Sequence, residues 1–382
     1  MAVKPKNTAT FNTNDKIDTF SDQVLAWFDI HGRKHLPWQQ DINAYRVWIS
    51  EIMLQQTQVA TVIPYFERFM QSFPDVKTLA EADIDNVFHH WSGLGYYTRA
   101  KNLHKSAQMI MQDFNGEFPD NQADVMLLPG IGQSTSGAIC SIAYKQPTAI
   151  LDGNVKRVLA RVFAIEGWPG KNDVLKQLWA VAEAHTPQQR TNDHTQAMMD
   201  LGATLCTRSK PACQQCPVQA HCKAYKTDTI ANFPGKKPRK VVPVKNTCML
   251  VINNDDKVLL QQRPITGIWP GLWSFTEMPL MESQEATLDD KALKTQLIHM
   301  GLPTPDSFEF MQGFRHTFSH YHLDIQILVL NYQKQPCKAV MESGQLWYNP
   351  KKPAEVGLAA PVTKILKRLQ QQSSRQQQEL AV

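Results

Sequence analysis

Apolar residues recur at helical spacing through the first part of the chain. In TFSDQVLAWFDI, from Thr19, and NVKRVLARVFAI, from Asn154, they fall three or four positions apart, and short Gly and Pro breaks separate such runs. This pattern predicts an all-α domain over residues 18–228, preceded by a flexible N-terminus over residues 1–17.

The periodicity changes after ANFPGKKPRKVVPVK, which we interpret as a linker over residues 229–245. Strand-like runs such as TCMLVI, KVLLQQR, LDIQILVL and GQLWYN follow, together with helical stretches near DDKALKTQLIHM and PVTKILKRL. They predict an α+β domain over residues 246–370. The polar end predicts a disordered tail over residues 371–382. The linker carries a basic run of Lys236, Lys237, Arg239 and Lys240.

Composition fits two domains, because 382 residues exceed one ordinary core. The formal net charge of +5 favours polyanionic partners only slightly. No stretch has the apolar character of a signal peptide or a membrane span. We therefore expect no membrane partner and an intracellular, cytoplasmic location, associated with the nucleoid in a bacterium.

Seven cysteines occur, and four of them crowd into one short segment. In a reducing compartment this favours metal binding over disulfides. Four thiolates in one loop, spaced x6, x2 and x5, suit the four irons of a cubane, so the spacing favours one 4Fe-4S cluster; zinc and adventitious cysteines are the alternatives. The four are Cys206, Cys213, Cys216 and Cys222. Arg208 and Lys210 lie between the first two, where a fixed loop could aim them at phosphates.

A glycine-rich turn, LLPGIGQ at residues 127–133, joins two helical stretches. Gly130 and Gly132 allow close backbone approach, and amides at the following helix N-terminus could bind a phosphate. Taken alone, the turn is equally an ordinary helix connection.

Two carboxylates stand out in helical surroundings. Asp152 begins a helix in ILDGNVKRVLARV, where it is an N-cap, a stabiliser of a developing cation, or both; helix amides should lower its pKa. Glu51 shares one helix face with Gln55 and Gln58. Apolar neighbours of Glu51, such as Trp48, should raise its pKa, which suits a general acid, although a surface stripe would give the same pattern.

Together these residues resemble the adenine DNA glycosylases of the MutY type, in the helix-hairpin-helix superfamily that also contains endonuclease III. The resemblance covers nearly the whole chain. Besides the cysteine loop it rests on LPWQ (36–39), SEIMLQQTQV (50–59), GLGYYTRA (93–100), LPGIGQSTSGAI (128–139), LDGNVKRV (151–158) and QAMMDLGA (196–203). It implies an N-terminal helix-hairpin-helix glycosylase domain with a 4Fe-4S loop, and a C-terminal Nudix-like domain.

The resemblance also implies roles in the chemistry of base removal. Glu51 would protonate the imidazole ring of adenine and then help to activate water, while Asp152, assisted by Asn154, would stabilise or trap the oxocarbenium-like sugar.

Further roles concern the flipped base and the opened stack. Leu54 and Gln55 would fill the stack, and Tyr96 would intercalate beside the opposite base. The adenine pocket would be lined by Arg33, Val59 and Gln196.

One position bears on the reaction's outcome. Relatives that also nick the strand carry a Schiff-base lysine where this chain has Ser134. Ser134, which we count among the substrate-binding positions, therefore predicts a monofunctional enzyme that leaves an abasic site; nearby Lys156 could give residual lyase activity.

For the C-terminal domain the resemblance implies recognition of 8-oxoguanine by Phe318, Ser319 and His320. A working Nudix site needs a helix with several acids. Gly271 and Glu277 match the first spacing of its signature, but the following ESQEATLDDKALK lacks the required acids. We expect a binding module without metal chemistry.

The expected partner is double-stranded DNA containing adenine paired with 8-oxoguanine or guanine, bound by a monomer. No motif identifies a clamp or another repair protein. The alternatives are a bifunctional glycosylase like endonuclease III, a non-catalytic DNA-binding protein and, least favoured, a Nudix hydrolase.

Overall fold

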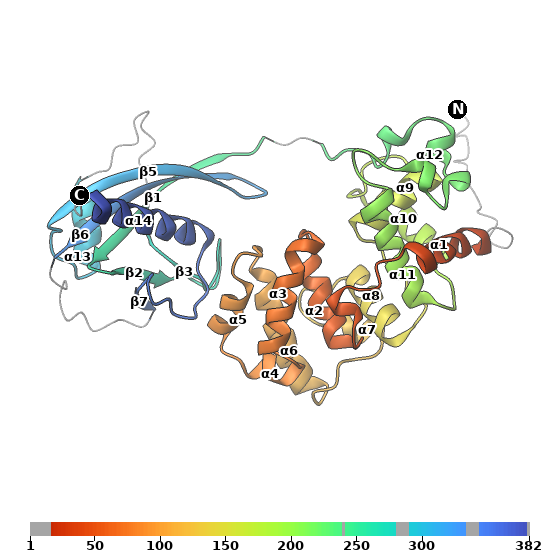
Figure 1. Cartoon of the computed structure of the whole chain (residues 1–382), viewed down its shortest axis with the longest axis horizontal. Helices are drawn as coiled ribbons and strands as arrows, with labels where there is room; N and C mark the ends of the chain where they lie inside the picture. The colour runs from red at the N-terminus through yellow and green to blue at the C-terminus, as the bar shows by residue number, and fades with distance from the viewer. Residues whose placement is uncertain (1–16, 239–240, 280–289, 334–343, 380–382) are drawn as a thin grey trace, which may run out of the picture. The chain divides into compact units, whose positions relative to one another are not determined.

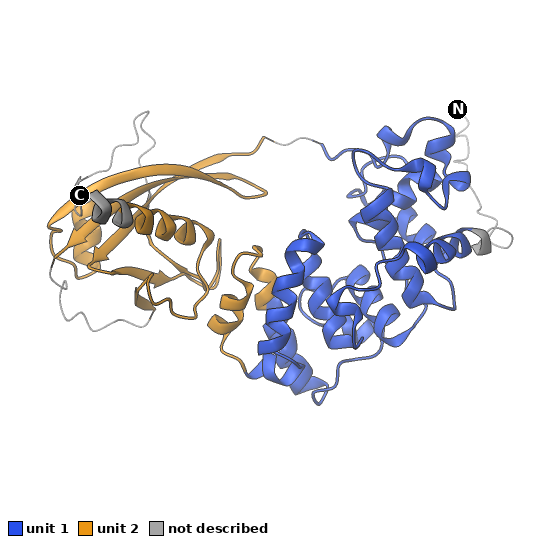
Figure 2. Ribbon diagram, viewed as in Figure 1, with its two compact units in different colours: residues 1–81, 102–238 blue, residues 82–101, 239–382 orange. Residues whose placement is uncertain are grey.

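The computed structural model describes residues 17–238, 241–279, 290–333 and 344–379. These belong to two compact units (Figure 2). Unit 1 comprises residues 1–81 and 102–238, and unit 2 comprises residues 82–101 and 239–382. The predicted N-terminal segment lies outside the described residues except for Ile17, as do Arg239 and Lys240 of the basic run.

Unit 1 is helical throughout its described residues, which confirms the predicted fold class (Figure 1). Its longer helices are α1 (Ile17–His31), α2 (Ala44–Leu54), α3 (Val59–Ser72), α6 (Thr98–Asp113, which begins in unit 2), α8 (Gln133–Tyr144), α9 (Gly153–Phe163), α10 (Asn172–Ala184) and α11 (Thr191–Asp200). Shorter ones are η1 (Pro37–Gln39), α4 (Val76–Glu81), α7 (Gln122–Val125), the π-helix η2 (Leu201–Leu205), η3 (Cys213–Gln215), η4 (Gln219–His221), α12 (Lys223–Lys226) and η5 (Ile230–Asn232).

Helix α9 shows how the apolar pattern forms the core of unit 1. Val155, Val158, Leu159 and Val162 lie at i, i+3, i+4 and i+7, and each is at most 3 % exposed. They belong to one apolar cluster with residues of α10, α11 and the cysteine loop. Burying each such side chain stabilises the fold by about 1.5–3 kcal/mol. The packed cluster therefore holds α9, and the residue at which it begins, in a fixed position.

Unit 2 contains a seven-stranded sheet with helices, as the predicted α+β class requires. The strand order is β3-β2-β1-β6-β5; β4 pairs with β1 and β7 with β2. Only the β1–β6 pairing is parallel among the described strands. The strands are β1 (Val244–Asn254), β2 (Lys257–Gln262), β3 (Trp273–Ser274), β4 (Thr276–Pro279), β5 (Ser307–Thr317), β6 (His322–Tyr332) and β7 (Gln345–Tyr348), and the helices are α5 (Ile84–Trp91), α13 (Asp290–His299) and α14 (Ala360–Glu379).

The sequence placed residues 82–101 in the helical domain, whereas the structure groups them with the sheet. The Tyr97 hydroxyl donates to the Leu358 carbonyl at 3.2 Å, and the Trp273 indole N–H donates to Asp85 at 3.2 Å. Phe88 packs so closely on Gly357 that a Cβ there would lie 2.4 Å from Phe88 Cβ. These long-range contacts leave no signal in local periodicity.

A second difference concerns the end of the chain. Residues 371–379, predicted to be a disordered tail, continue helix α14. The segment is polar but lacks glycine and proline, and glutamine, arginine and glutamate are good helix formers.

Among the helices that the structure describes, none has the length and apolar character needed to cross a bilayer.

Candidate active site

A pocket that opens to solvent lies within unit 1, lined by residues of several helices. Nine of its lining residues are among those predicted from the sequence: Arg33, Glu51, Leu54, Gln55, Val59, Ser134, Asp152, Asn154 and Gln196. Six were not predicted: Leu36, Trp38, Thr57, Thr135, Met199 and Ala203. Residues up to 170 positions apart in the chain, from 33 to 203, thus meet around the two carboxylates.

Glu51 enters the pocket from the last turn of α2. Its neighbours Trp48, Ile49, Ile52 and Met53 are at most 3 % exposed, so α2 is firmly anchored in the core. Burial, reinforced by the negative charge of Asp152, raises the pKa of Glu51 to about 8. The expected rise is confirmed, and Glu51 is mainly protonated at neutral pH.

Asp152 is the N-cap of α9, with one carboxylate oxygen accepting from the Val155 amide at 2.7 Å. The expected lowering of its pKa is wrong for the DNA-free protein: burial raises the pKa, although the amides of Val155 and Asn154 and the charges of Arg157 and Lys156 oppose the rise. An N-cap pattern cannot reveal how deeply the cap is buried.

Ser134 lies in the first turn of α8 and contacts the segment that leads to Asp152. Its hydroxyl oxygen accepts from the Leu151 amide at 2.9 Å. The hydroxyl therefore fixes the backbone immediately before the N-cap.

Asp200 holds two side chains that line the pocket. This fully buried acid accepts from Arg33 three times, from Nη2 at 2.7 Å, Nε at 2.9 Å and the backbone amide at 2.8 Å, and from the Gln196 amide at 2.8 Å. One carboxylate thus orients Arg33 and Gln196, two of the three side chains predicted to line the adenine pocket. The sequence reasoning missed Asp200, although its position one helical turn after Gln196 was a signal.

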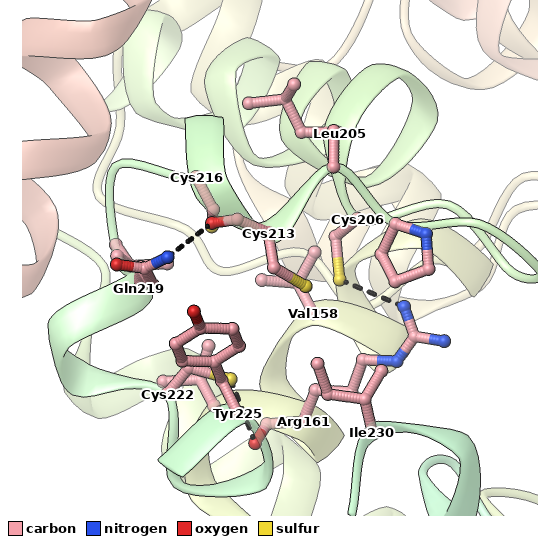
Figure 3. A pocket seen from close by; sticks show the side chains of 14 residues that line it. Val158, Arg161, Leu205, Cys206, Cys213, Cys216, Gln219, Cys222, Tyr225 and Ile230 are labelled. Atoms are coloured by element: carbon pink, nitrogen blue, oxygen red, sulfur yellow. Dashed lines mark hydrogen bonds between the residues drawn. The ribbon is translucent and has the colours of Figure 1, made fainter. Parts of the chain in front are cut away.

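The four predicted cysteines line a second pocket of unit 1, together with Arg161 and Tyr225 (Figure 3). Burial raises the pKa of Cys213, Cys216 and Cys222, that of Cys216 to about 11. Thiols arranged around a pocket fit a cubane, whose irons each take one of them.

Two arginines of α9 tie the cysteine loop to the helix. Arg161, 4 % exposed, donates to the Cys206 sulfur at 3.3 Å and to the Thr207 carbonyl at 2.8 Å. Arg157 donates to the Cys206 carbonyl at 2.7 Å and to the side-chain oxygen of Asn154 at 2.9 Å. Arg157 therefore contacts both a pocket residue and a cysteine ligand, which the sequence reasoning did not foresee.

The predicted phosphate-binding residues lie on the surface of unit 1. Gly130 has φ +82°, and a Cβ there would lie 2.7 Å from the Asn102 side chain. Gly132 caps α8, and a Cβ there would meet nothing within 4 Å, which leaves its backbone accessible. Arg208 and Lys210 are exposed on the cysteine loop.

The remaining predicted residues lie in unit 2. Tyr96 has φ +50° and is 51 % exposed. Phe318 is half-buried in the loop between β5 and β6, where Ser319 and His320 are exposed. Glu277, the acid that matches part of the Nudix signature, binds Arg263 at 2.5 Å; the segment that should carry further acids falls largely outside the described residues.

Known proteins resemble this chain in each of these parts. Residues 49–184 match the model of the HhH-GPD superfamily of base excision DNA repair proteins, residues 247–368 match that of the NUDIX domain, and residues 206–222 match the iron-sulfur binding domain of endonuclease III. An adenine DNA glycosylase of Buchnera aphidicola subsp. Acyrthosiphon pisum is 39 % identical over 349 residues, which cover 91 % of this chain and 96 % of the relative. The chain belongs to the adenine DNA glycosylase family.

A second relative has the same activity in its name, and a solved structure shares the fold of part of the chain. The Homo sapiens adenine DNA glycosylase is 34 % identical, with 87 % of this chain and 70 % of the relative covered. The structure of a thermostable thymine-DNA glycosylase is 27 % identical in sequence, with a TM-score of 0.51. The match covers 56 % of this chain and 99 % of that one. The glycosylase therefore acts on adenine in DNA during base excision repair and carries a 4Fe-4S cluster, which excludes the zinc and non-catalytic alternatives.

Proposed function

We propose that the glycosylase is monofunctional and removes adenine paired with 8-oxoguanine, and more slowly adenine paired with guanine, leaving an abasic site. The observation that carries the proposal is the pocket in which Glu51, with its pKa raised to about 8, faces Asp152. A protonated and an ionisable carboxyl group in one pocket are what glycosidic cleavage by acid catalysis requires.

Base removal begins when adenine is flipped out of the duplex into this pocket. Arg33 and Gln196, held by Asp200, orient the base, while Val59 lines its pocket; Leu54 and Gln55 fill the space it leaves.

Glu51 then donates its proton to a nitrogen of the imidazole ring. The bond from the sugar to the base breaks with its electron pair moving to the base, and positive charge develops on the sugar. Asp152 stabilises that charge or bonds to the sugar carbon. Water finally adds to this carbon, and the Glu51 carboxylate accepts the proton that water loses.

Ionisation of Asp152 accompanies substrate binding in this scheme. Burial alone favours its neutral form, but a developing cation adds to the effect of the Val155 amide and of Arg157, and all three favour the carboxylate. Asn154 lies beside it in the pocket, held by Arg157.

The pocket offers a hydroxyl where a lyase needs an amine. Ser134 accepts from the Leu151 amide, so its oxygen is engaged with the backbone. Without a Schiff base to the sugar, the strand stays intact after base loss. Lys156 follows the N-cap and is the residue to which residual lyase activity would be attributed.

Unit 2 supplies recognition of the base opposite adenine in this proposal. Ser319 and His320 are exposed at the tip of a short loop and present polar atoms that can bond 8-oxoguanine, and exposed Tyr96 intercalates beside it. In this proposal the protein acts as a monomer. It works in the cytoplasm and associates with the nucleoid in a bacterium.

The test uses duplexes that contain one adenine:8-oxoguanine pair. Free adenine and strand breaks are measured with and without alkali; the expected result is adenine release with breaks only after alkali. Breaks without alkali would instead establish a bifunctional enzyme. Glu51→Gln should retain duplex binding and lose adenine release, because it keeps the shape of the side chain but not its proton, and sustained turnover by this variant would refute the role of Glu51.

A further inference from the structure

A loop of unit 2, residues 264–271, contains a strained tryptophan that the chemistry of base removal does not use. Trp269 has φ +50°, in the left-handed region that bulky residues rarely adopt, and it is only 8 % exposed. A residue persists in such a conformation when its surroundings hold it there, and such strain is frequent at functional sites.

Arg263 and Glu277 provide these surroundings. The Arg263 amide donates to the Leu272 carbonyl at 2.8 Å and its Nε to the Ile268 carbonyl at 2.9 Å, which closes the loop at its base. The guanidinium lies 5.6 Å from the centre of the Trp269 ring and pairs with Glu277. Glu277, a remnant of the Nudix signature, thus neutralises the arginine that supports the tryptophan.

The indole of Trp269 faces the loop between β5 and β6. Its ring centre lies 5.1 Å from that of Phe318 and 5.2 Å from that of His316. Phe318 also contacts His316 at 4.6 Å and Tyr321 at 4.7 Å, so one side of its ring rests against an aromatic wall. The Phe318 amide donates to the Tyr321 carbonyl at 2.9 Å, which turns the chain and leaves the intervening residues exposed.

We propose that Trp269 is a positioning residue that determines specificity for the base opposite adenine. By fixing Phe318 it holds Ser319 and His320 in the conformation that binds 8-oxoguanine, so that little conformational freedom is lost on binding. The inference rests on the proposed function of the Phe318–His320 loop.

The experiment measures kcat and KM for adenine release by the full-length protein, on duplexes with 8-oxoguanine or guanine opposite adenine. Trp269→Leu removes two aromatic contacts and should reduce the preference for 8-oxoguanine, as a ratio of kcat/KM values, roughly tenfold. The loss should lie in KM for the 8-oxoguanine duplex, with kcat on the guanine duplex unchanged. Trp269→Phe, which retains a ring, should keep most of the preference.

Trp347→Leu is the matched control, because Trp347 packs against the sheet core of the same unit. It should lower the unfolding temperature without changing the ratio of kcat/KM values. An equal loss of preference would make the effect of Trp269 one of general stability and overturn the proposal.

Ser319→Ala and His320→Ala test the underlying function. If they reduce the preference and Trp269→Leu does not, only the positioning role fails; if neither does, the loop's proposed function fails and this inference with it.

Discussion

The pKa of Glu51 ties the pH dependence of catalysis to a single side chain. Its raised value of about 8 means that the free enzyme holds the required proton below that pH and loses it above. We predict that kcat/KM for adenine release falls as pH rises through about 8, by about tenfold per pH unit beyond it. A pH profile under conditions where chemistry limits the rate measures this, and a flat profile between pH 7 and 9 would contradict it.

The same shift makes a prediction about stability. Because the folded-state pKa lies above the unfolded value, the folded protein binds more protons between pH 4.5 and about 8, and stability falls as pH rises through this window. Glu51→Gln removes the ionisable group, so we expect it to increase the free energy of unfolding at pH 8 by up to about 4 kcal/mol. Denaturant unfolding at pH 5 and pH 8 should show the gain at the higher pH alone.

Asp200 is the residue whose loss should damage the pocket most without touching the reacting bond. Asp200→Asn leaves Arg33 without its buried counterion and should cost about 2–3 kcal/mol of stability and reduce adenine release. Asp29→Asn breaks the pair with Arg190, which has a 2.6 Å contact but half-exposed side chains, and should cost under about 1 kcal/mol. Thermal unfolding of both variants makes the comparison; equal costs would show that burial of Asp200 is unimportant.

Among single residues, the sequence predicted those that a short-range pattern reveals. Glu51, Asp152 and the four cysteines were found because helix periodicity, a cap and ligand spacing are short-range patterns. Asp200 and Arg157 were missed, since their partners Arg33 and Cys206 are 167 and 49 positions away. The net pKa direction of Asp152 was also beyond the sequence, because it depends on burial by distant segments.

Among the elements, α9 contributes residues to both the catalytic pocket and the cysteine pocket of unit 1. Asp152 caps it, its apolar face lies in the core, and Arg157 and Arg161 bind the cysteine loop. The helix was predicted from its periodicity. The π-helix Leu201–Leu205 was not predicted; it brings Gly202 so close to α9 that a Cβ there would lie 2.6 Å from Asn154 Cβ, a fit that only the tertiary structure reveals.

This arrangement predicts what loss of one cysteine ligand does. Cys206→Ala should lower iron content, the unfolding temperature and DNA affinity before it lowers the rate of base release from bound DNA, because the loop lies outside the catalytic pocket. Iron analysis, thermal unfolding and single-turnover kinetics separate these effects. Cys248→Ala, at a buried cysteine of β1, is the control and should leave iron content unchanged. A Cys206→Ala protein that folds and binds DNA normally would contradict the structural role of the loop.

For the whole molecule, composition predicted two parts and the strand pattern predicted the class of the second. The assignment of residues 82–101 to the sheet-containing unit was beyond the sequence, because Phe88, Tyr97 and Asp85 make contacts with partners more than 180 positions away. The net charge of +5 predicted only a modest preference for polyanions. For DNA binding, the location of the basic residues matters more than their sum.

Arg208 and Lys210 are exposed on the cysteine loop, where their contribution to DNA binding can be tested. A contact with a phosphate releases a counterion, so each contributes about 0.9 to the slope of log affinity against log salt concentration. We predict that Arg208→Ala and Lys210→Ala each reduce the slope by about this amount and weaken binding equally for mispaired and fully paired duplexes, because phosphate contacts carry no base information. Lys257→Ala, beside Asp255 and Asp256 where a phosphate is disfavoured, should leave the slope unchanged. Affinities measured in the Glu51→Gln background, which prevents turnover, provide the slopes, and an effect confined to mispaired duplexes would show that the loop reads the lesion instead of the backbone.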